Sequence, residues 1–360
     1  MQYEYWLAAI GGLAPVKKLQ LRNMYNFAKE LYYIEETELK HIHFLSDRDR
    51  KIINDSKKTW QLEKEYRSLC EKNISLILYH DCVYPLALKR LTAPPYALFV
   101  KGRLPPSDRF AVGIVGARRC TRYGETMARE IAGQLAARGI SIISGLAKGV
   151  DGAAGRGALD AEGRSYAVLG SGADVCYPRE HIGLYMDVQK SGGIISEQPV
   201  GVMPLPHHFP ARNRIISGLS DVVIVIEAKT KSGSLITADM AVEQGKDVYA
   251  LPGPVTSALS SGCNALIKQG AGVFLSVEDF LQDVKVIYER NVKIPTKNQI
   301  KLESAENLVY SCLDLFPKSL DMILRETELS ITALMNILVT LELKGYIEEI
   351  SKNCYVRKGS

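Results

Sequence analysis

Four short segments of the chain combine small residues with lysine or arginine, and three of them follow a predicted strand directly. The first two run from Gly113 to Gly124 and from Ser144 to Gly152. The other two cover residues 209–214, which we interpret as a loop, and residues 229–237. Small residues let backbone amides approach a ligand closely, and amides at a helix N-terminus together with nearby cations bind anions. We therefore expect the four segments to meet at one edge of a sheet as a site for a polyanion.

The spacing of residues excludes several other glycine-rich or metal sites. The dinucleotide pattern G-x-G-x-x-G, the P-loop pattern and the G-x-S-x-G nucleophile elbow are all absent. The seven cysteines form no C-x-x-C pair and the six histidines have no metal spacing, so we expect neither a disulfide framework nor a metal site, and no cofactor. Asp151 and Glu227 could be imagined as an acid–base pair, but we favour structural roles for both: Asp151 caps its helix or orients a loop cation, and Glu227 ends a strand.

The segments between residues 75 and 275 alternate between strand and helix patterns. Short continuous runs of valine, isoleucine and leucine between helices are typical of parallel strands that are buried on both faces. The predicted strands are 75–79, 96–102, 110–116, 140–144, 166–170, 193–197, 221–227 and 247–253. The predicted helices include 124–138, 151–161, 235–244 and 262–269. Right-handed crossovers then give an α/β fold with a Rossmann-like, doubly wound, mostly parallel sheet.

Two further domains are expected, one before and one after the Rossmann-like domain. The predicted boundaries are 1–72 for the helical domain, 73–285 for the Rossmann-like domain and 300–360 for the third domain. Residues 1–72 read as short helices, and the turn from Ile10 to Pro15 is either helix-hairpin-helix chemistry, in which glycines approach DNA phosphates, or a plain structural turn. Residues 276–300 read as a linker. Helical patterns at 303–316, 318–325 and 330–344, followed by an alternating pair of strands, predict a winged helix. Its third helix has no arginine, so we expect partner docking or regulation rather than major-groove reading.

Bulk composition fits an ordinary globular protein. The net charge of +5 allows anionic partners without requiring them, and 46% of the residues are hydrophobic. No stretch approaches the roughly 20 apolar residues of a membrane helix, and residues 1–10 lack the features of a signal peptide. We therefore expect a cytoplasmic protein with no membrane partner.

Together these motifs resemble the DNA-processing protein A (DprA, or Smf) family. The strings that carry the resemblance are V-G-A-R-R, S-G-L-A-K-G-V-D-G-A-A, Y-P-R-E, S-E-Q-P, F-P-A-R-N-R, K-S-G-S-L-I-T and L-P-G-P, in a single order from about residue 84 to residue 274. The resemblance implies a binding protein rather than an enzyme. It would hold single-stranded DNA, form a homodimer, protect incoming DNA, and load the recombinase RecA onto DNA coated by single-strand binding protein during natural transformation.

The resemblance also assigns candidate residues. It makes Arg118 and Lys231 the principal phosphate ligands, with Arg119 less central because adjacent side chains diverge. The remaining candidates are Gly116, Ser144, Gly145, Lys148, Gly149, Phe209, Arg212, Asn213, Arg214, Ser232, Gly233 and Ser234. Phe209 is either a stacking platform for a base or a core residue, beside Tyr123 and Tyr177. The family's dimer surface corresponds to the stretch around Leu266, Ile267 and Val273.

One position departs from the family, and two other functions stay open. Gly155 stands where the family usually has a histidine, which costs helix stability but leaves the phosphate loops intact. A related scaffold serves lysine-decarboxylase-like nucleotide phosphoribohydrolases, but residues 231–239 lack the glutamate of their P-G-G-x-G-T-x-x-E motif. A transcription regulator that reads duplex DNA through the winged helix is the third hypothesis.

Overall fold

The computed structural model describes residues 1–288, 304–313, 318–327, 329–351 and 353–357. Its contacts divide the chain into two compact units, residues 1–293 and 294–360. The prediction of a linker at 276–300 is wrong for its first half. Residues 277–288 form helix α14 (Val277–Tyr288), which buries Val277, Phe280 and Leu281 against the sheet. The second half of that segment lies outside the described residues.

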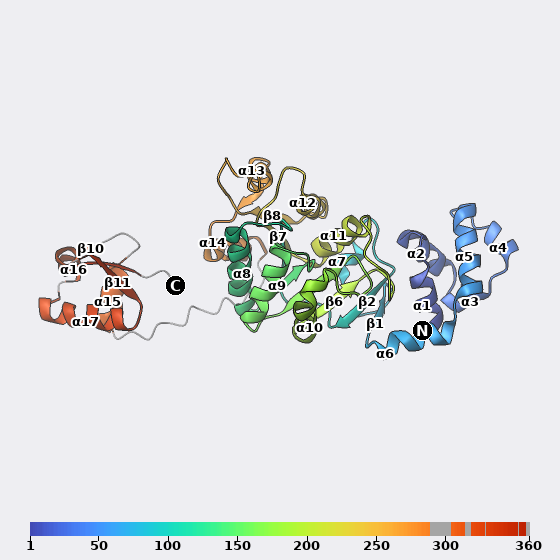
Figure 1. The fold of residues 1–360 in the computed structure, drawn as a ribbon, viewed down its shortest axis with the longest axis horizontal. Helices are drawn as coiled ribbons and strands as arrows, with labels where there is room; N and C mark the ends of the chain where they lie inside the picture. The colour runs from blue at the N-terminus through green and yellow to red at the C-terminus, as the bar shows by residue number, and fades with distance from the viewer. Residues whose placement is uncertain (289–303, 314–317, 328, 352, 358–360) are drawn as a thin grey trace. The chain divides into compact units, whose positions relative to one another are not determined.

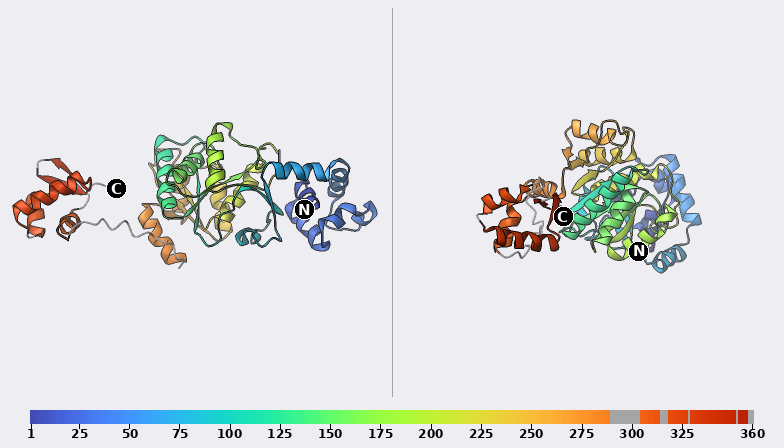
Figure 2. Two further views of the ribbon diagram at one scale, coloured as in Figure 1. Left: turned by 90° about the horizontal axis from the view of Figure 1, so that it is seen from below. Right: turned by 60° about the vertical axis from the view of Figure 1, so that its left-hand side comes forward.

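The first unit begins with six short helices that pack on the edge of the sheet. They are α1 (Gln2–Ala9), α2 (Pro15–Met24), α3 (Ala28–Tyr33), α4 (Glu36–Lys40), α5 (Asp47–Thr59) and α6 (Leu62–Glu71). Figures 1 and 2 show them in blue beside β1 and β2. The rings of Tyr5 and Phe99, the latter on β2, pack edge-on with their centroids 5.8 Å apart. The Tyr96 hydroxyl donates a hydrogen bond of 2.5 Å to the Glu4 carboxylate. The helices and the sheet therefore share one buried core.

The sheet confirms the predicted Rossmann-like α/β class. Its nine strands are β1 (Ser75–Leu78), β2 (Ala97–Gly102), β3 (Ala111–Val115), β4 (Ser141–Ser144), β5 (Ser165–Leu169), β6 (Gly193–Ser196), β7 (Val222–Val225), β8 (Asp247–Ala250) and β9 (Gly272–Val273). Their order is β1-β2-β6-β5-β4-β3-β7-β8-β9. Strand β2 pairs antiparallel with both of its neighbours, β1 and β6, and all the other pairs are parallel. The short edge strand β9 was not predicted from the sequence.

Helices cover both faces of this sheet (Figure 1). One face packs against α8 (Arg122–Ala137), α9 (Val150–Asp160), α10 (Ile182–Ser191) and α14. The other packs against α7 (Leu86–Lys89), α11 (His208–Leu219), α12 (Gly233–Glu243) and α13 (Ser261–Lys268). The strands on either side of β3 belong to different halves of the chain, β4 on one side and β7 on the other. This is the switch point at which open α/β sheets bind ligands.

The second unit has the predicted helices and wing. It contains α15 (Ser304–Cys312), β10 (Lys318–Ser319), α16 (Leu320–Thr327), α17 (Ile331–Leu343), β11 (Ile347–Ser351) and β12 (Cys354–Arg357). Part of the first predicted helix, residues 314–316, lies outside the described residues, and residues 318–319 form a strand where a helix was predicted. Leu334, Leu338 and Leu341 of α17 are buried in this unit's own core.

Candidate functional site

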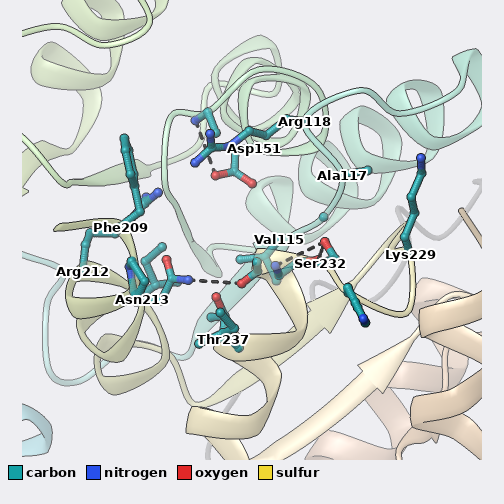
Figure 3. A pocket seen from close by; sticks show the side chains of 18 of the residues that line it. Val115, Ala117, Arg118, Asp151, Phe209, Arg212, Asn213, Lys229, Ser232 and Thr237 are labelled. Carbon is teal, nitrogen blue, oxygen red and sulfur yellow. Dashed lines mark hydrogen bonds between the residues drawn. The ribbon is translucent and has the colours of Figure 1, made fainter. Parts of the chain in front are cut away.

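A cavity of about 370 Å³ opens at the carboxyl ends of β3, β4 and β7 (Figure 3). Its walls come from the turns after these strands, from the first turns of α11, and from the N-terminus of α12. Ten of the residues expected at the site line it: Gly116, Arg118, Arg119, Phe209, Arg212, Asn213, Lys231, Ser232, Gly233 and Ser234. The glycine-rich corners therefore converge on one rim, and Arg118 and Lys231 share it.

The turn after β3 is held so that Arg118 stays exposed at the rim. A Cβ at Gly116 would lie 2.6 Å from Cγ2 of Val150, so only glycine lets this turn approach α9 so closely. Farther along, the buried Glu227 carboxylate accepts hydrogen bonds from the backbone N–H and the hydroxyl of Thr121, at 2.8 and 2.7 Å. Thr121 in turn caps α8. Glu227 thus has the structural role expected from the sequence, and it does not line the cavity.

Asp151 fixes the turn after β4 from beneath. This buried carboxylate accepts the backbone N–H of Gly145 at 3.1 Å and that of Ala147 at 3.4 Å. Burial raises the pKa of Asp151, while the charges of Arg212 and Arg118 oppose that rise. Asp151 therefore orients a loop beside two cations, as expected for a structural anion.

Residues 209–214 form the first turns of a helix, so their interpretation as a loop was wrong. Helix α11 begins at His208, and Pro210 lies in its first turn, where a proline is tolerated. The helix directs Phe209, Arg212 and Asn213 into the cavity (Figure 3). The guanidinium groups of Arg118 and Arg212 lie over the Phe209 ring, with their Cζ atoms 4.8 Å and 6.0 Å from its centroid.

Arg212 is a buried cation with spare hydrogen-bonding capacity. Its Nη1 donates to the carbonyl of Val168 at 2.7 Å, whereas its buried Nε has no hydrogen-bond partner among the described residues. Burial lowers the pKa of Arg212 to about 10, so it stays protonated at neutral pH. The cavity therefore has a permanently charged donor in its wall.

The N-terminus of α12 supplies backbone amides to the opposite wall. The Ser232 hydroxyl caps the helix by accepting from the N–H of Ser234 at 3.4 Å, and Asn213 Nδ2 donates to the carbonyl of Gly233 at 3.2 Å. A Cβ at Gly233 would meet no atom within 4 Å, so space remains beside this helix end. A helix N-terminus with open space in front of it favours an anion.

The charge of the lining is strongly one-sided. It contains the cations Arg118, Arg119, Arg212, Lys229 and Lys231 but only one carboxylate, that of Asp151. Within the described part of the chain, the exposed side chains of Arg118, Arg119, Lys229 and Lys231 form no ion pair. The cavity therefore suits a ligand that carries several negative charges.

Five expected residues lie outside the lining. The Ser144 hydroxyl is buried and donates to the carbonyl of Ile114 at 2.7 Å. Gly149 has φ +73° and begins α9 where a Cβ would lie 2.3 Å from the carbonyl oxygen of Ala117. Gly145 makes room for Arg212, since a Cβ there would lie 1.7 Å from Nη1. These three residues shape the cavity from behind and do not line it.

The other two, Lys148 and Arg214, are occupied by carboxylates. Lys148 Nζ lies 2.7 Å from Glu180, and Arg214 Nη2 lies 2.7 and 2.6 Å from the two oxygens of Glu197. On a helix, residues two apart point in different directions, so Arg214 leaves the cavity that Arg212 enters. Conversely, Lys229 lines the cavity. It lies in the predicted segment 229–237 but was not among the candidate ligands, because these followed the family motif, which begins two residues later.

The residues expected at a dimer surface lie on α13 and β9. Leu266 is buried in the core beneath the sheet, Ile267 is half-buried, and Val273 is exposed on the edge strand. Leu275, just beyond that strand, is also exposed. An unpaired strand edge beside apolar side chains can pair with another chain.

In the winged helix, the single lysine at the end of the third helix is already engaged. Lys344 Nζ lies 2.7 Å from Glu306 of α15. The exposed side chains of α17 include the apolar Ile331, Val339 and Leu343. This surface lacks the cations that read duplex DNA.

Comparison with known proteins decides the family. The model of the family "DNA recombination-mediator protein A" matches residues 75–285, and that of the "DprA winged helix domain" matches residues 294–351. The chain belongs to the DNA recombination-mediator protein A family. The resemblance drawn from the motifs is thereby confirmed, and the role that the family model names is DNA processing as a recombination mediator.

Relatives of this family cover most of the chain. The protein Smf of Escherichia coli is 38% identical over 309 residues, which are 81% of this chain and 82% of the relative. The solved structure of DprA from Streptococcus pneumoniae matches with a TM-score of 0.67 and 34% identity, over 79% of this chain and 98% of that one. DNA processing protein A from Helicobacter pylori, whose unique single-stranded DNA binding mode has been described structurally, matches with a TM-score of 0.53 and 30% identity, over 59% of this chain and 97% of that one.

The described residues contain neither a candidate membrane span nor a candidate metal site. None of their helices has the length and apolar character needed to cross a membrane. In the same part of the chain, no group of three or more His, Cys, Asp and Glu side chains could hold a metal ion.

Proposed function

We propose that this protein binds single-stranded DNA in the cavity at the switch point and acts as a recombination mediator. The observation that carries the proposal is the convergence of five cations and the N-terminus of α12 on one concave site. Such a site takes phosphates without reading bases. It would be filled by the backbone of a flexible strand, because a single strand can direct its phosphates inward whereas a stiff duplex is too wide to enter.

The proposed cellular role follows the family. The protein would protect incoming DNA in the cytoplasm during natural transformation and load the recombinase RecA onto DNA coated by single-strand binding protein. It would act as a homodimer, with the edge strand β9 and the apolar residues Ile267, Val273 and Leu275 at the contact, while the buried Leu266 supports that surface from within. The exposed apolar face of α17 fits a partner-docking role for the winged helix better than duplex reading.

We propose a binding protein rather than an enzyme. The two carboxylates that could form an acid–base pair are engaged structurally, Asp151 by two backbone amides and Glu227 by Thr121. The alternative, a nucleotide phosphoribohydrolase, would need a free carboxylate in the cavity. Incubating the protein with nucleoside monophosphates and finding released base that depends on Asp151 would favour this enzyme.

The direct test is strand preference coupled to recombinase loading. A labelled single strand bound to the protein is challenged with unlabelled single strand or duplex, and RecA assembly is followed on DNA coated by single-strand binding protein. We expect only the single strand to compete well, and the wild type to accelerate RecA assembly more than the Arg118→Ala variant does. Equal competition by duplex would overturn the proposed ligand.

A further inference from the structure

A second cavity of about 380 Å³ lies on the other side of α11, between this helix and the turn that joins α1 to α2. Phe209, Arg212 and Asn213 of α11 line the first cavity, whereas His207, His208 and Arg214 line the second. The two cavities therefore flank the first turns of a single helix. Because a helix with its side chains is about 10 Å across, one extended strand can reach both cavities.

The wall opposite α11 contains the open N-terminus of α2. The N-cap residue Ala14 has no side chain that could cap the helix, and Pro15 follows it. The amides of Gly11 and Gly12 find no hydrogen-bond acceptor among the described residues. A Cβ at Gly11 would meet no atom within 4 Å, so the space in front of this turn is free. Unpaired amides in the turn that leads into a helix, close to the positive end of its dipole, attract an anion.

A buried lysine faces the same cavity. Lys18 is 8% exposed, and its ammonium donates to the carbonyl of Ala8 at 2.6 Å but lies in no ion pair with a described residue. The carboxylate of Glu197 also lines the cavity, yet both of its oxygens already bind Arg214. Burial lowers the pKa of Lys18 to about 8, and the negative charge of Glu197 offsets only part of that fall. A buried cation without an anion of its own is costly unless a ligand supplies the charge.

We propose that this second cavity binds another phosphate of the same DNA strand, held by Lys18 and the amides of the Gly11–Gly12 turn. The strand would leave the first cavity, cross the N-terminal end of α11, and enter the second. This inference rests on the proposed function and extends it, because the helical N-terminal region becomes part of the DNA interface. Contacts to phosphate alone would keep it independent of sequence.

The test places a charge in the free space beside Gly11. Gly11→Glu adds a carboxylate to the cavity, and Gly11→Gln adds a neutral side chain of the same size. Gly183→Glu adds the same charge at another open position, on α10, which lines neither cavity. Lys18→Met removes the buried cation. Affinities are measured for oligothymidylates that lengthen one nucleotide at a time.

We expect Gly11→Glu to bind long oligonucleotides about tenfold more weakly than Gly11→Gln, because a carboxylate beside a phosphate is repulsive. The shortest oligonucleotides that bind should show no difference, because they fill only the first cavity. Lys18→Met should reduce the salt slope for long strands by about 0.7. Gly183→Glu should bind like the wild type at every length.

Two outcomes would overturn the inference. One is equal binding of the Glu and Gln variants at all lengths, while Arg118→Ala still weakens binding; the proposed function would then survive without this extension. The other is a Gly11→Glu variant that is no longer stabilised against heat by inorganic phosphate but still binds long DNA with unchanged affinity. The second cavity would then bind a free ion only. Failure of the wild type to bind any oligonucleotide would instead refute the proposed function itself.

Discussion

Replacing Gly145 by alanine should damage the site through a residue distant in sequence. A Cβ at this position would lie 1.7 Å from Nη1 and 2.4 Å from Cζ of Arg212, so the guanidinium has to move. The backbone of Gly145 does not have a positive φ, and alanine therefore adds little strain of its own. The cost falls on the hydrogen bond from Arg212 to the carbonyl of Val168, which is 2.7 Å long.

The size of the effect follows from that bond. A hydrogen bond to a charged group contributes about 1.5–3 kcal/mol, so Gly145→Ala should lower the free energy of unfolding by about that amount. If the displaced guanidinium also loses a phosphate, the salt slope of single-strand binding falls by about 0.7. Urea unfolding and fluorescence anisotropy at several salt concentrations measure the two quantities.

A double-mutant cycle with Arg212→Met isolates the cause. Once the guanidinium is absent, Gly145→Ala should change neither stability nor affinity further, because the clash has been removed. Equal costs of Gly145→Ala in the wild-type and Arg212→Met backgrounds would refute the reasoning, since the damage would then come from somewhere other than Arg212.

Three further predictions concern the same unit. Lys18→Met should be more stable to urea than the wild type at pH 7. Folding lowers the pKa of Lys18 from 10.5 to about 8, so between these pH values the folded protein has lost this proton while the unfolded chain still holds it, and the wild type gains stability as pH rises. The difference in stability should therefore close over that range, and a difference that widens with pH would contradict this. On α9, Gly155→Ala should raise the melting temperature, because the new Cβ meets nothing closer than 3.5 Å and helix propensity improves by up to about 1 kcal/mol. Gly157→Ala should lower it, because its Cβ would lie 2.0 Å from the carbonyl oxygen of Arg129. Phe209→Leu should weaken single-strand binding about five- to tenfold through lost stacking while leaving the salt slope unchanged, and a changed slope would point to displaced cations instead.

The sheet could be predicted because its strands are continuous apolar runs. Strands such as β3 and β7 are buried on both faces, and this leaves a signal that needs no knowledge of the partners. Helix α14 was missed although Val277, Phe280, Leu281 and Val284 recur at helical spacing, because the charged residues between them suggested a linker. Helix α11 was hidden by Pro210, which usually signals a loop.

The site was predictable in its position and only partly in its members. The four segments could be placed at one rim because the carboxyl ends of parallel strands lie together. Which cations face the ligand depends on tertiary contacts: Lys148 and Arg214 are bound by Glu180 and Glu197, and both acids lie in other segments. Gly145 belongs to the site for a reason that only the position of Arg212 reveals.

The most direct test of the central claim is the salt dependence of single-strand binding for matched cation variants. Arg118→Ala and Lys231→Ala remove exposed cations from the rim, while Lys148→Ala removes one that is paired with Glu180 outside the cavity. We predict that each rim variant reduces the slope of log K against log salt by about 0.7 and that Lys148→Ala leaves it unchanged. If Arg118→Ala and Lys231→Ala instead kept the wild-type slope and affinity, DNA would not be bound at this rim.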